Sequence, residues 1–514
     1  MTALTRRALT GALLAAGFGA AAQAQPAVNG DGSLLVAPLI AQASGCWDEF
    51  DAPNGSYFLK PIGGQNLQAT PPVAGGGCPV DVGFGSVGYV GAVSDGGVGR
   101  ATLFTHDGSA TPIGGAVPLS GFSHTSSGLA EFGSPQFAFS DSGLTDGDIG
   151  VYSVGAGASY TPPHGRATLT TVATYLGFQF GPGATAIPAP LYGALVQFPV
   201  TIDPIDLAYN PAGPSNLSGP LVLDRDAYCR IFHGDISDWS DPRLASIPGQ
   251  RLSNPSYGLT GPGNPSVPIE VVVRADSSGA SSILTRHLAR VCDGVLGSSN
   301  PYQSGVTTFP PDSLTHIPMQ SPQMGGVAVA AEINNYAGAI GYLDNNYIST
   351  AANTFLLPAA SVINSSNQTI APSPFSVAAA FSPVALPQDV SDPFQWAQSP
   401  DKSVELADPS TSGAYSIVGT TQFLGYTCYA TLDSVTTLRE FLQFLYDSDG
   451  QAIIQANGLA PLPSTWTTAI VTTFLNPQDG GFDVSTALAD INGDTGDDPF
   501  FPDTNNACIG LVGG

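Results

Sequence analysis

The sequence predicts a mixed α/β fold with large loop insertions. Short runs rich in β-branched and aromatic residues end in Gly, Ser or Pro and alternate with a few amphipathic stretches. A hydrophobic content of 43% supplies enough apolar residues for buried cores, and 514 residues are enough for two or three domains. The 62 glycines and 44 prolines indicate many turns between short elements.

The clearest helix is expected over residues 434–449. Ser434 or Asp433 can cap its start, and Gly450 follows its expected end. Apolar residues recur at helical spacing and form one stripe, which we expect to pack in a core. The stripe consists of Val435, Leu438, Phe441, Leu442 and Leu445.

A strand followed by a helix is expected from Ile269 onward. The strand covers 269–273, and a turn leads into a helix whose apolar face carries Ile283, Leu284, Leu288 and Val291. Three other regions are rich in Gly, Ser, Thr and Pro and show little helical periodicity, so we expect surface loops and hairpins there. They cover about 90–135, 143–195 and 296–322.

The first 24 residues are expected to be a signal peptide. A basic start with Arg6 and Arg7 precedes an apolar run too short to span a bilayer, and Ala22-Gln23-Ala24 fits a cleavage site. The two arginines leave both the twin-arginine and the general export route open. No later stretch has the roughly 18 uninterrupted apolar residues of a membrane helix. We therefore expect a periplasmic or secreted protein that does not insert into a membrane.

Six cysteines form an even set, and they are spaced too widely for the short-range ligand pairs of a zinc site. In an oxidising compartment we expect disulfides. The sequence leaves their connectivity open. Nearest-neighbour pairing is the simplest scheme, and it joins Cys46 to Cys78, Cys229 to Cys292 and Cys428 to Cys508.

The charge of the chain excludes some partners. With 14 basic and 40 acidic residues, the net charge is −26, which repels nucleic acids and anionic membrane surfaces. If the ligand is an anion, the overall charge does not attract it. Donors aimed locally, such as the backbone amides of a helix N-terminus, must then bind it.

The segment 274–281 has the residues of an anion site. A strand delivers Arg274, Asp276 can hold its guanidinium, and a Ser-Ser-Gly turn opens a helix whose first N–H groups are unpaired. Gly279 permits close approach of the backbone, and Ser278 adds a hydroxyl. A capped helix beside a structural Arg–Asp pair explains the same residues, and this segment alone leaves both interpretations open.

This segment and several others resemble the periplasmic phosphate-binding proteins of PstS type and the related secreted DING proteins. The matches follow one another along nearly the whole chain, separated by long insertions. They cover 30–38, 83–88, 139–142, 207–210, 231–239, 272–281, 338–342 and 460–463. The resemblance implies a two-lobed, periplasmic-binding-protein-like fold of type II with a hinge between the lobes. One lobe would comprise 25–200 plus 400–514, and the other 205–395.

The resemblance further implies that phosphate, or a similar tetrahedral oxyanion, binds between the lobes. Serine hydroxyls, an arginine and backbone amides would donate to it, and Asp141 would accept the proton of hydrogen phosphate. Because sulfate carries no such proton, Asp141 should reject it. The implied binding residues are Leu34, Leu35, Ser86, Asp141, Arg274, Ser278, Gly279 and Ala280.

Two hydroxyls of the family pattern are missing. Leu34 and Ala280 stand where the family has threonine, while Ser33 and Ser281 lie beside these positions. Neighbouring residues on a strand or helix start point in different directions, which puts the affinity and the identity of the ligand in question.

The resemblance predicts an exported solute-binding protein that passes phosphate to an ABC permease without a cofactor or metal. Some DING-type relatives are regarded as phosphatases, so a secreted alkaline phosphatase on the same scaffold stays open, although no Gly-x-Ser-x-Gly elbow occurs. A surface or matrix protein that keeps the fold is the third alternative.

Two signals for metal binding are weak. Residues 490–498 carry oxygen ligands at alternate positions, like the start of a calcium loop, but lack glycine at the sixth position and glutamate at the twelfth. The six histidines are scattered, and none stands at a metal-binding distance in sequence from another histidine or a cysteine. We expect neither calcium nor zinc.

Overall fold

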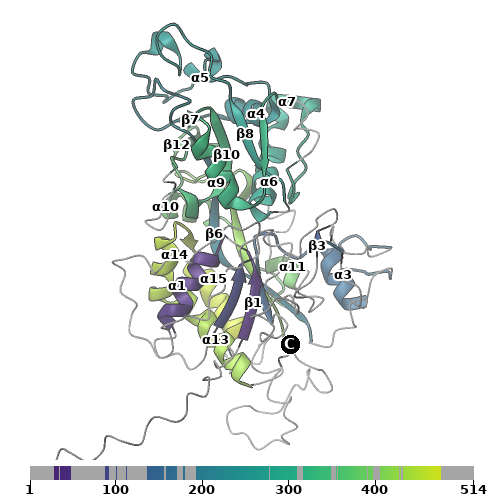
Figure 1. The fold of residues 1–514 in the computed structure, drawn as a ribbon. Coiled ribbons are helices and arrows are strands. Elements are labelled where there is room, and N and C mark those ends of the chain that lie inside the picture. The colour runs from purple at the N-terminus through teal and green to yellow at the C-terminus, as the bar shows by residue number, and fades with distance from the viewer. Residues whose placement is uncertain are drawn as a thin grey trace, which may run out of the picture.

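The chain folds into two lobes that lie one above the other in Figure 1. The strand β6 (Leu195–Tyr209) runs from the first, lower lobe into the second, upper lobe. In this computed structural model the described residues are 28–33, 35–47, 87–91, 100, 103, 111–112, 136–154, 158–170, 178–179, 193–276, 278–309, 317–348, 355, 357–390, 392–396, 406–427, 429 and 432–475.

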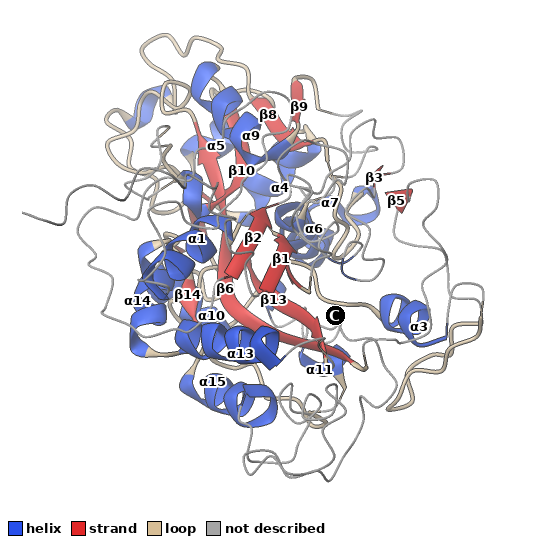
Figure 2. Ribbon diagram, turned by 60° about the horizontal axis from the view of Figure 1, so that its bottom comes forward, coloured by secondary structure: helices blue, strands red, loops and turns tan. Residues whose placement is uncertain are grey.

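The first lobe is built on a sheet flanked by helices. Its strands are β1 (Val28–Gly32), β2 (Val87–Gly91), β4 (Phe137–Ser140), β13 (Val418–Tyr426), β14 (Ala460–Pro461) and the first part of β6. Its helices are α1 (Ala37–Trp47), α3 (Asp146–Val154), α11 (Pro393–Trp396), α13 (Leu432–Tyr446), α14 (Ser448–Ala456) and α15 (Ser464–Ile470). Figures 1 and 2 show α1, α13, α14 and α15 on one side of this sheet and α3 on the other.

The second lobe contains the remainder of β6 and most of the middle of the chain. Its strands are β7 (Val222–Leu223), β8 (Glu270–Arg274), β9 (Gln320–Gln323), β10 (Ala339–Asp344), β11 (Ser361–Ile363) and β12 (Thr369–Ile370). Its helices are α4 (Arg225–His233), α5 (Pro242–Ala245), α6 (Gly279–Val291), α7 (Asp293–Leu296) and α9 (Gly325–Asn335). Helix α10 (Pro374–Phe381) packs against β6 and β14 where the lobes meet.

One path of hydrogen-bonded strands joins the lobes, in the order β2-β1-β4-β13-β6-β10-β8-β9. Strand β6 pairs antiparallel with β13 from Leu195 to Pro204 and with β10 from Ile205 to Tyr209. Its neighbours therefore change between Pro204 and Ile205, and the sheet passes there from the first lobe to the second.

Helices cover both faces of the sheet in the second lobe. Val271 and Val273 of β8 share a core with the apolar face of α6, whereas Val272 points to the opposite face and packs with Val329 of α9. The predicted strand and helix are confirmed. The predicted apolar face is also confirmed as buried, with Ile283, Leu284, Leu288 and Val291 in the core.

Aromatic side chains fill the core of the first lobe. The ring of Phe198 on β6 stacks between Phe423 of β13, at 4.8 Å between centroids, and Phe474 near the end of the described chain, at 4.9 Å. Burying one such side chain contributes about 1.5–3 kcal/mol. These contacts hold the carboxyl-terminal helices against the sheet.

The expected helix over 434–449 is in fact two helices. Its apolar stripe is buried in α13 as predicted, but α13 ends at Tyr446 and Asp447 caps α14 by accepting from the amides of Asp449 and Gly450. The prediction that Gly450 ends the helix was wrong. Gly450 lies within α14, where a Cβ would overlap the backbone of Leu445, so its missing side chain permits the close turn between the helices.

The expectation of loops over 143–195 was wrong for α3. Asp148 accepts hydrogen bonds from the amide and hydroxyl of Thr145 and pairs with Arg100. These contacts fix the first turn of a helix too short and too rich in glycine to show periodicity. Beyond it, Tyr160 and Leu169 form an antiparallel bridge, which agrees with the expected hairpins.

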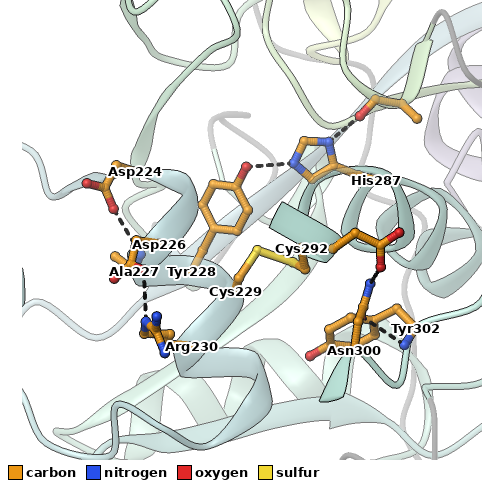
Figure 3. The surroundings of a disulfide bond; sticks show 12 residues. Asp224, Asp226, Ala227, Tyr228, Cys229, Arg230, His287, Cys292, Asn300 and Tyr302 are labelled. Atoms are coloured by element: carbon orange, nitrogen blue, oxygen red, sulfur yellow. Dashed lines mark hydrogen bonds and ion pairs between the residues drawn. A yellow bond between two sulfur atoms is a disulfide. The ribbon is translucent and has the colours of Figure 1, made fainter. Parts of the chain in front are cut away.

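A buried disulfide joins Cys229 of α4 to Cys292 at the end of α6 (Figure 3). This confirms one of the three predicted pairs. The side chain of Cys46 and the cysteines at 78, 428 and 508 lie outside the described residues.

Beside the disulfide, His287 bonds to the Tyr228 hydroxyl at 3.0 Å and to the carbonyl of Ala407. Burial lowers the pKa of His287 to about 4, so the imidazole is neutral near pH 7.

In the part of the chain that the structure describes, no helix combines the length and the apolar character needed to cross a membrane. The expected signal peptide, residues 1–24, lies outside that part.

Candidate functional site

The turn between β8 and α6 carries a buried ion pair. Arg274 donates from Nε to Asp276 Oδ1 at 2.8 Å and from Nη2 to Oδ2 at 2.6 Å, and both side chains are 2% exposed. The amide of Gly325 also donates to Asp276, at 3.1 Å. Asp276 therefore orients the guanidinium at the start of α6, as the sequence predicted.

Ser278 is the N-cap of α6. Its Oγ accepts from the amide of Ser281 at 3.3 Å, and its own amide donates to the carbonyl of Thr307 at 2.7 Å. A hydroxyl that accepts from the helix keeps its proton for another acceptor. The N-terminus of α6 also carries a partial positive charge. The turn therefore combines a guanidinium, a hydroxyl donor and a helix N-terminus, and each of these favours an anion.

Asp141 brings a carboxylate from the first lobe to this helix start. It follows β4 and is 1% exposed. Ser33 donates to its Oδ1 at 2.6 Å, and the hydroxyl of Thr421 lies 2.7 Å from the same oxygen. A Cβ at Gly279 would overlap both Cβ and Oδ2 of Asp141. The two lobes thus meet at a point where only glycine fits.

Five of the eight predicted site residues are found at this junction. They are Asp141, Arg274, Ser278, Gly279 and Ala280, and Ala280 is buried in the core. The amide of Leu35 donates at 3.1 Å to Ser33 Oγ, the same hydroxyl that donates to Asp141. Leu34 and Ser86 lie outside the described residues.

The two serines beside the missing threonines have other partners. The hydroxyl of Ser33 donates to Asp141. The hydroxyl of Ser281 pairs with that of Tyr342 on β10 at 2.7 Å. Both contacts are with side chains of the protein.

Sequence reasoning missed a hydrogen-bonded array behind Asp141. Thr421 of β13 lies 2.8 Å from Oδ2 of Asp203 on β6, and Thr201 donates to Oδ1 of Asp203 at 2.6 Å. Asp203 is fully buried, and this burial raises its pKa to about 7, although the hydrogen bonds from both threonines act in the opposite direction. A carboxylate inside the apolar run 195–209 was the available signal, since a buried carboxyl group needs donors.

No cluster of three or more His, Cys, Asp or Glu side chains suited to a metal occurs among the described residues. The calcium-like segment 490–498 lies outside them.

Known proteins resemble this chain in sequence and in fold. The chain is 27% identical over 336 residues to a phosphate-binding protein from an unknown prokaryotic organism, a match that covers 60% of this chain and 78% of that protein. It is also 27% identical over 294 residues to alkaline phosphatase L of Pseudomonas aeruginosa (strain UCBPP-PA14), covering 55% of this chain and 68% of that protein.

Among solved structures, a high-affinity periplasmic phosphate-binding protein, PfluDING, bound with phosphate, has a TM-score of 0.58 at 21% identity. The match covers 88% of this chain and 95% of that chain. The predicted two-lobed, periplasmic-binding-protein-like fold is thereby confirmed. A PBP superfamily domain matches residues 186–449, which is just over half of the sequence. The chain belongs to the PBP superfamily.

Proposed function

We propose that this protein captures phosphate, or a similar tetrahedral oxyanion, between its two lobes at the start of α6. One observation carries the proposal: Asp141 of the first lobe lies against Gly279 of the second, beside the N-cap Ser278. A carboxylate aimed at a helix N-terminus can accept a proton from an anion that the helix amides bind.

Each group of the proposed site has a role that follows from its chemistry. Arg274 supplies a fixed charge held by Asp276, and Ser278 and the first amides of α6 supply directed donors. The proposed site also includes Leu34, Leu35, Ser86 and Ala280, which the resemblance implies.

We further propose that the lobes, 25–200 plus 400–514 and 205–395, close on the anion by a hinge. The change of partners of β6 between Pro204 and Ile205 supports a hinge there. An anion held by donors from both lobes stabilises the closed state by its higher affinity for that state.

The setting we propose is the periplasm or the extracellular space, with an ABC permease as the receiver of the ligand. The periplasmic part of this proposal is supported by the name of a structural relative, a periplasmic phosphate-binding protein.

Isothermal titration with phosphate, arsenate and sulfate tests the proposal. We expect binding of phosphate and arsenate and rejection of sulfate. In Asp141→Asn, the amide can donate to sulfate, so discrimination should fall by about 10-fold or more, which corresponds to a hydrogen bond to a charged group of about 1.5–3 kcal/mol. Asp226→Asn, on the half-exposed face of α4, is the matched control and should keep the selectivity. Lack of binding of all three anions would refute the proposal.

A phosphatase is the second candidate, because alkaline phosphatase L is among the relatives. The pure protein would then hydrolyse a chromogenic phosphate monoester, and Arg274→Ala would lose this turnover. Phosphate binding without turnover would exclude this candidate for that substrate.

A further inference from the structure

The hydroxyl of Thr421 lies between two buried carboxyl groups. Its Oγ1 is 2.7 Å from Asp141 Oδ1 and 2.8 Å from Asp203 Oδ2, and both distances are those of hydrogen bonds. A hydroxyl has one proton and donates only once. The second contact is a hydrogen bond only if one of the two carboxyl groups is protonated and donates to Thr421. The array of Asp141, Thr421 and Asp203 therefore contains one carboxylate and one protonated carboxyl group.

The surroundings assign this proton to Asp203. Oδ1 of Asp141 already receives the proton of Ser33, whose Oγ in turn accepts from the amide of Leu35. Asp141 also lies at the positive end of α6, which favours its ionised form. Asp203 is fully buried and receives hydrogen bonds from the Thr201 hydroxyl at Oδ1 and from the backbone amide of Thr421. No helix N-terminus or described ion pair offsets its burial, which favours the neutral acid. Its Oδ2 is then the donor to Thr421.

We propose that Asp203 is a positioning residue of the oxyanion site, which as a neutral acid donates to Thr421 and through it holds Asp141 as a carboxylate directed at the start of α6. This inference rests on the proposed function. It adds a residue that does not touch the anion but determines how well Asp141 accepts a proton from it. The raised pKa of Asp203, about 7, agrees with the neutral form.

Ionisation of Asp203 should weaken binding. Thr421 would then face two carboxylates and could donate to only one, and a second buried negative charge would lie behind the anion site. The other titratable side chains on β6, on β13 and around them include Asp206 and Tyr209 of β6, Tyr426 of β13, Tyr342 and Asp344 of β10, Arg286, His287 and Arg290 of α6, and Glu332 of α9, together with Asp141, Arg274, Asp276, Tyr347, Asp392, Tyr415 and Tyr446. Arg274 is paired with Asp276, and no described cation forms an ion pair with Asp203.

The test is the dissociation constant of phosphate measured by titration calorimetry between about pH 5.5 and pH 9. Asp203→Asn mimics the neutral acid, since its carbonyl accepts from Thr201 and its amide donates to Thr421. The ratio of the wild-type to the Asp203→Asn constant cancels the ionisation of phosphate itself. We expect a ratio near one below about pH 6 that rises by up to about tenfold per pH unit above about pH 7.

Two further variants separate positioning from packing. Thr421→Val keeps the shape but breaks the array, so its affinity should be about tenfold lower or worse even below about pH 6. Asp206→Asn removes another buried carboxyl of β6, whose partner is Asn345, and should keep the wild-type pH profile.

A ratio that stays constant with pH, or an Asp206→Asn variant that flattens the profile as much as Asp203→Asn, would overturn the inference while leaving the proposed function intact. Failure of the wild type to bind phosphate at every pH would overturn both.

Discussion

Removing the disulfide between Cys229 and Cys292 should destabilise the second lobe without disturbing the anion site. The bond closes a loop with a sequence separation of 63 residues between α4 and the end of α6. For a loop of this length, the chain-entropy relation gives about 4 kcal/mol of stabilisation at 25 °C through restriction of the unfolded chain. Both sulfurs are buried, so replacement by alanine also removes some packing.

The assay is denaturant unfolding of the double variant Cys229→Ala/Cys292→Ala, followed by tryptophan fluorescence, because Trp239 is buried in the same lobe. We expect the free energy of unfolding to fall by about 4 kcal/mol under oxidising conditions. In a thiol reductant that opens the bond in the unfolded wild type, the difference should shrink to the packing contribution.

Phosphate affinity should change by less than about threefold at low denaturant, because the bond lies at the opposite end of α6 from Ser278. A loss of less than about 1 kcal/mol under oxidising conditions would refute the reasoning, since the loop-closure contribution would then be absent.

Three other perturbations should have distinct results. Gly279→Ala should weaken phosphate binding about tenfold or more in calorimetry, because its methyl group would overlap the carboxylate of Asp141 in the first lobe. The control is Gly294→Ala on α7, where a Cβ meets nothing within 4 Å, and it should bind phosphate as the wild type does. Asp276→Ala should lower the free energy of unfolding by about 3–5 kcal/mol, because it leaves a buried guanidinium unpaired. Added phosphate should stabilise this variant less than the wild type, because Arg274 has lost the partner that orients it, and equal stabilisation of the two proteins by phosphate would contradict this. The free energy of unfolding should fall as the pH rises from about 4 to about 7, because the raised pKa of Asp203 lets the folded state bind one more proton than the unfolded state in this range. Asp203→Asn should reduce this slope in thermal-shift measurements. An unchanged slope would contradict the protonated form of Asp203.

The sequence allowed prediction of elements whose signals are local. The strand and helix around Arg274 and Ser278 follow from a change from a short apolar run to helical periodicity. The ion pair joins Arg274 to Asp276, which is only two residues away in the sequence. One disulfide followed from simple pairing of neighbouring cysteines. The ordered family motifs extended these local signals to the fold of both lobes.

The array behind Asp141 could not be predicted in the same way. Thr421 is 280 residues from Asp141 and 218 from Asp203 in the sequence, and no periodicity links these positions. Ser33 is 108 residues from Asp141, and its role depends on the register that places β1 beside β4. Side-chain contacts of this kind depend on strand order, which the sequence of a single strand does not determine.

The position of β13 bears on how the chain acquires its structure during synthesis. This strand is the last of the long strands in the sequence, yet it lies between β4 and β6. Until residue 426 has left the ribosome, β4 and β6 lack their common neighbour, and pairing of Tyr426 with Leu195 then closes a very long loop. Such non-local pairing slows folding and leaves strand edges exposed in the meantime. The nascent chain should therefore depend on chaperones until its carboxyl-terminal quarter is complete.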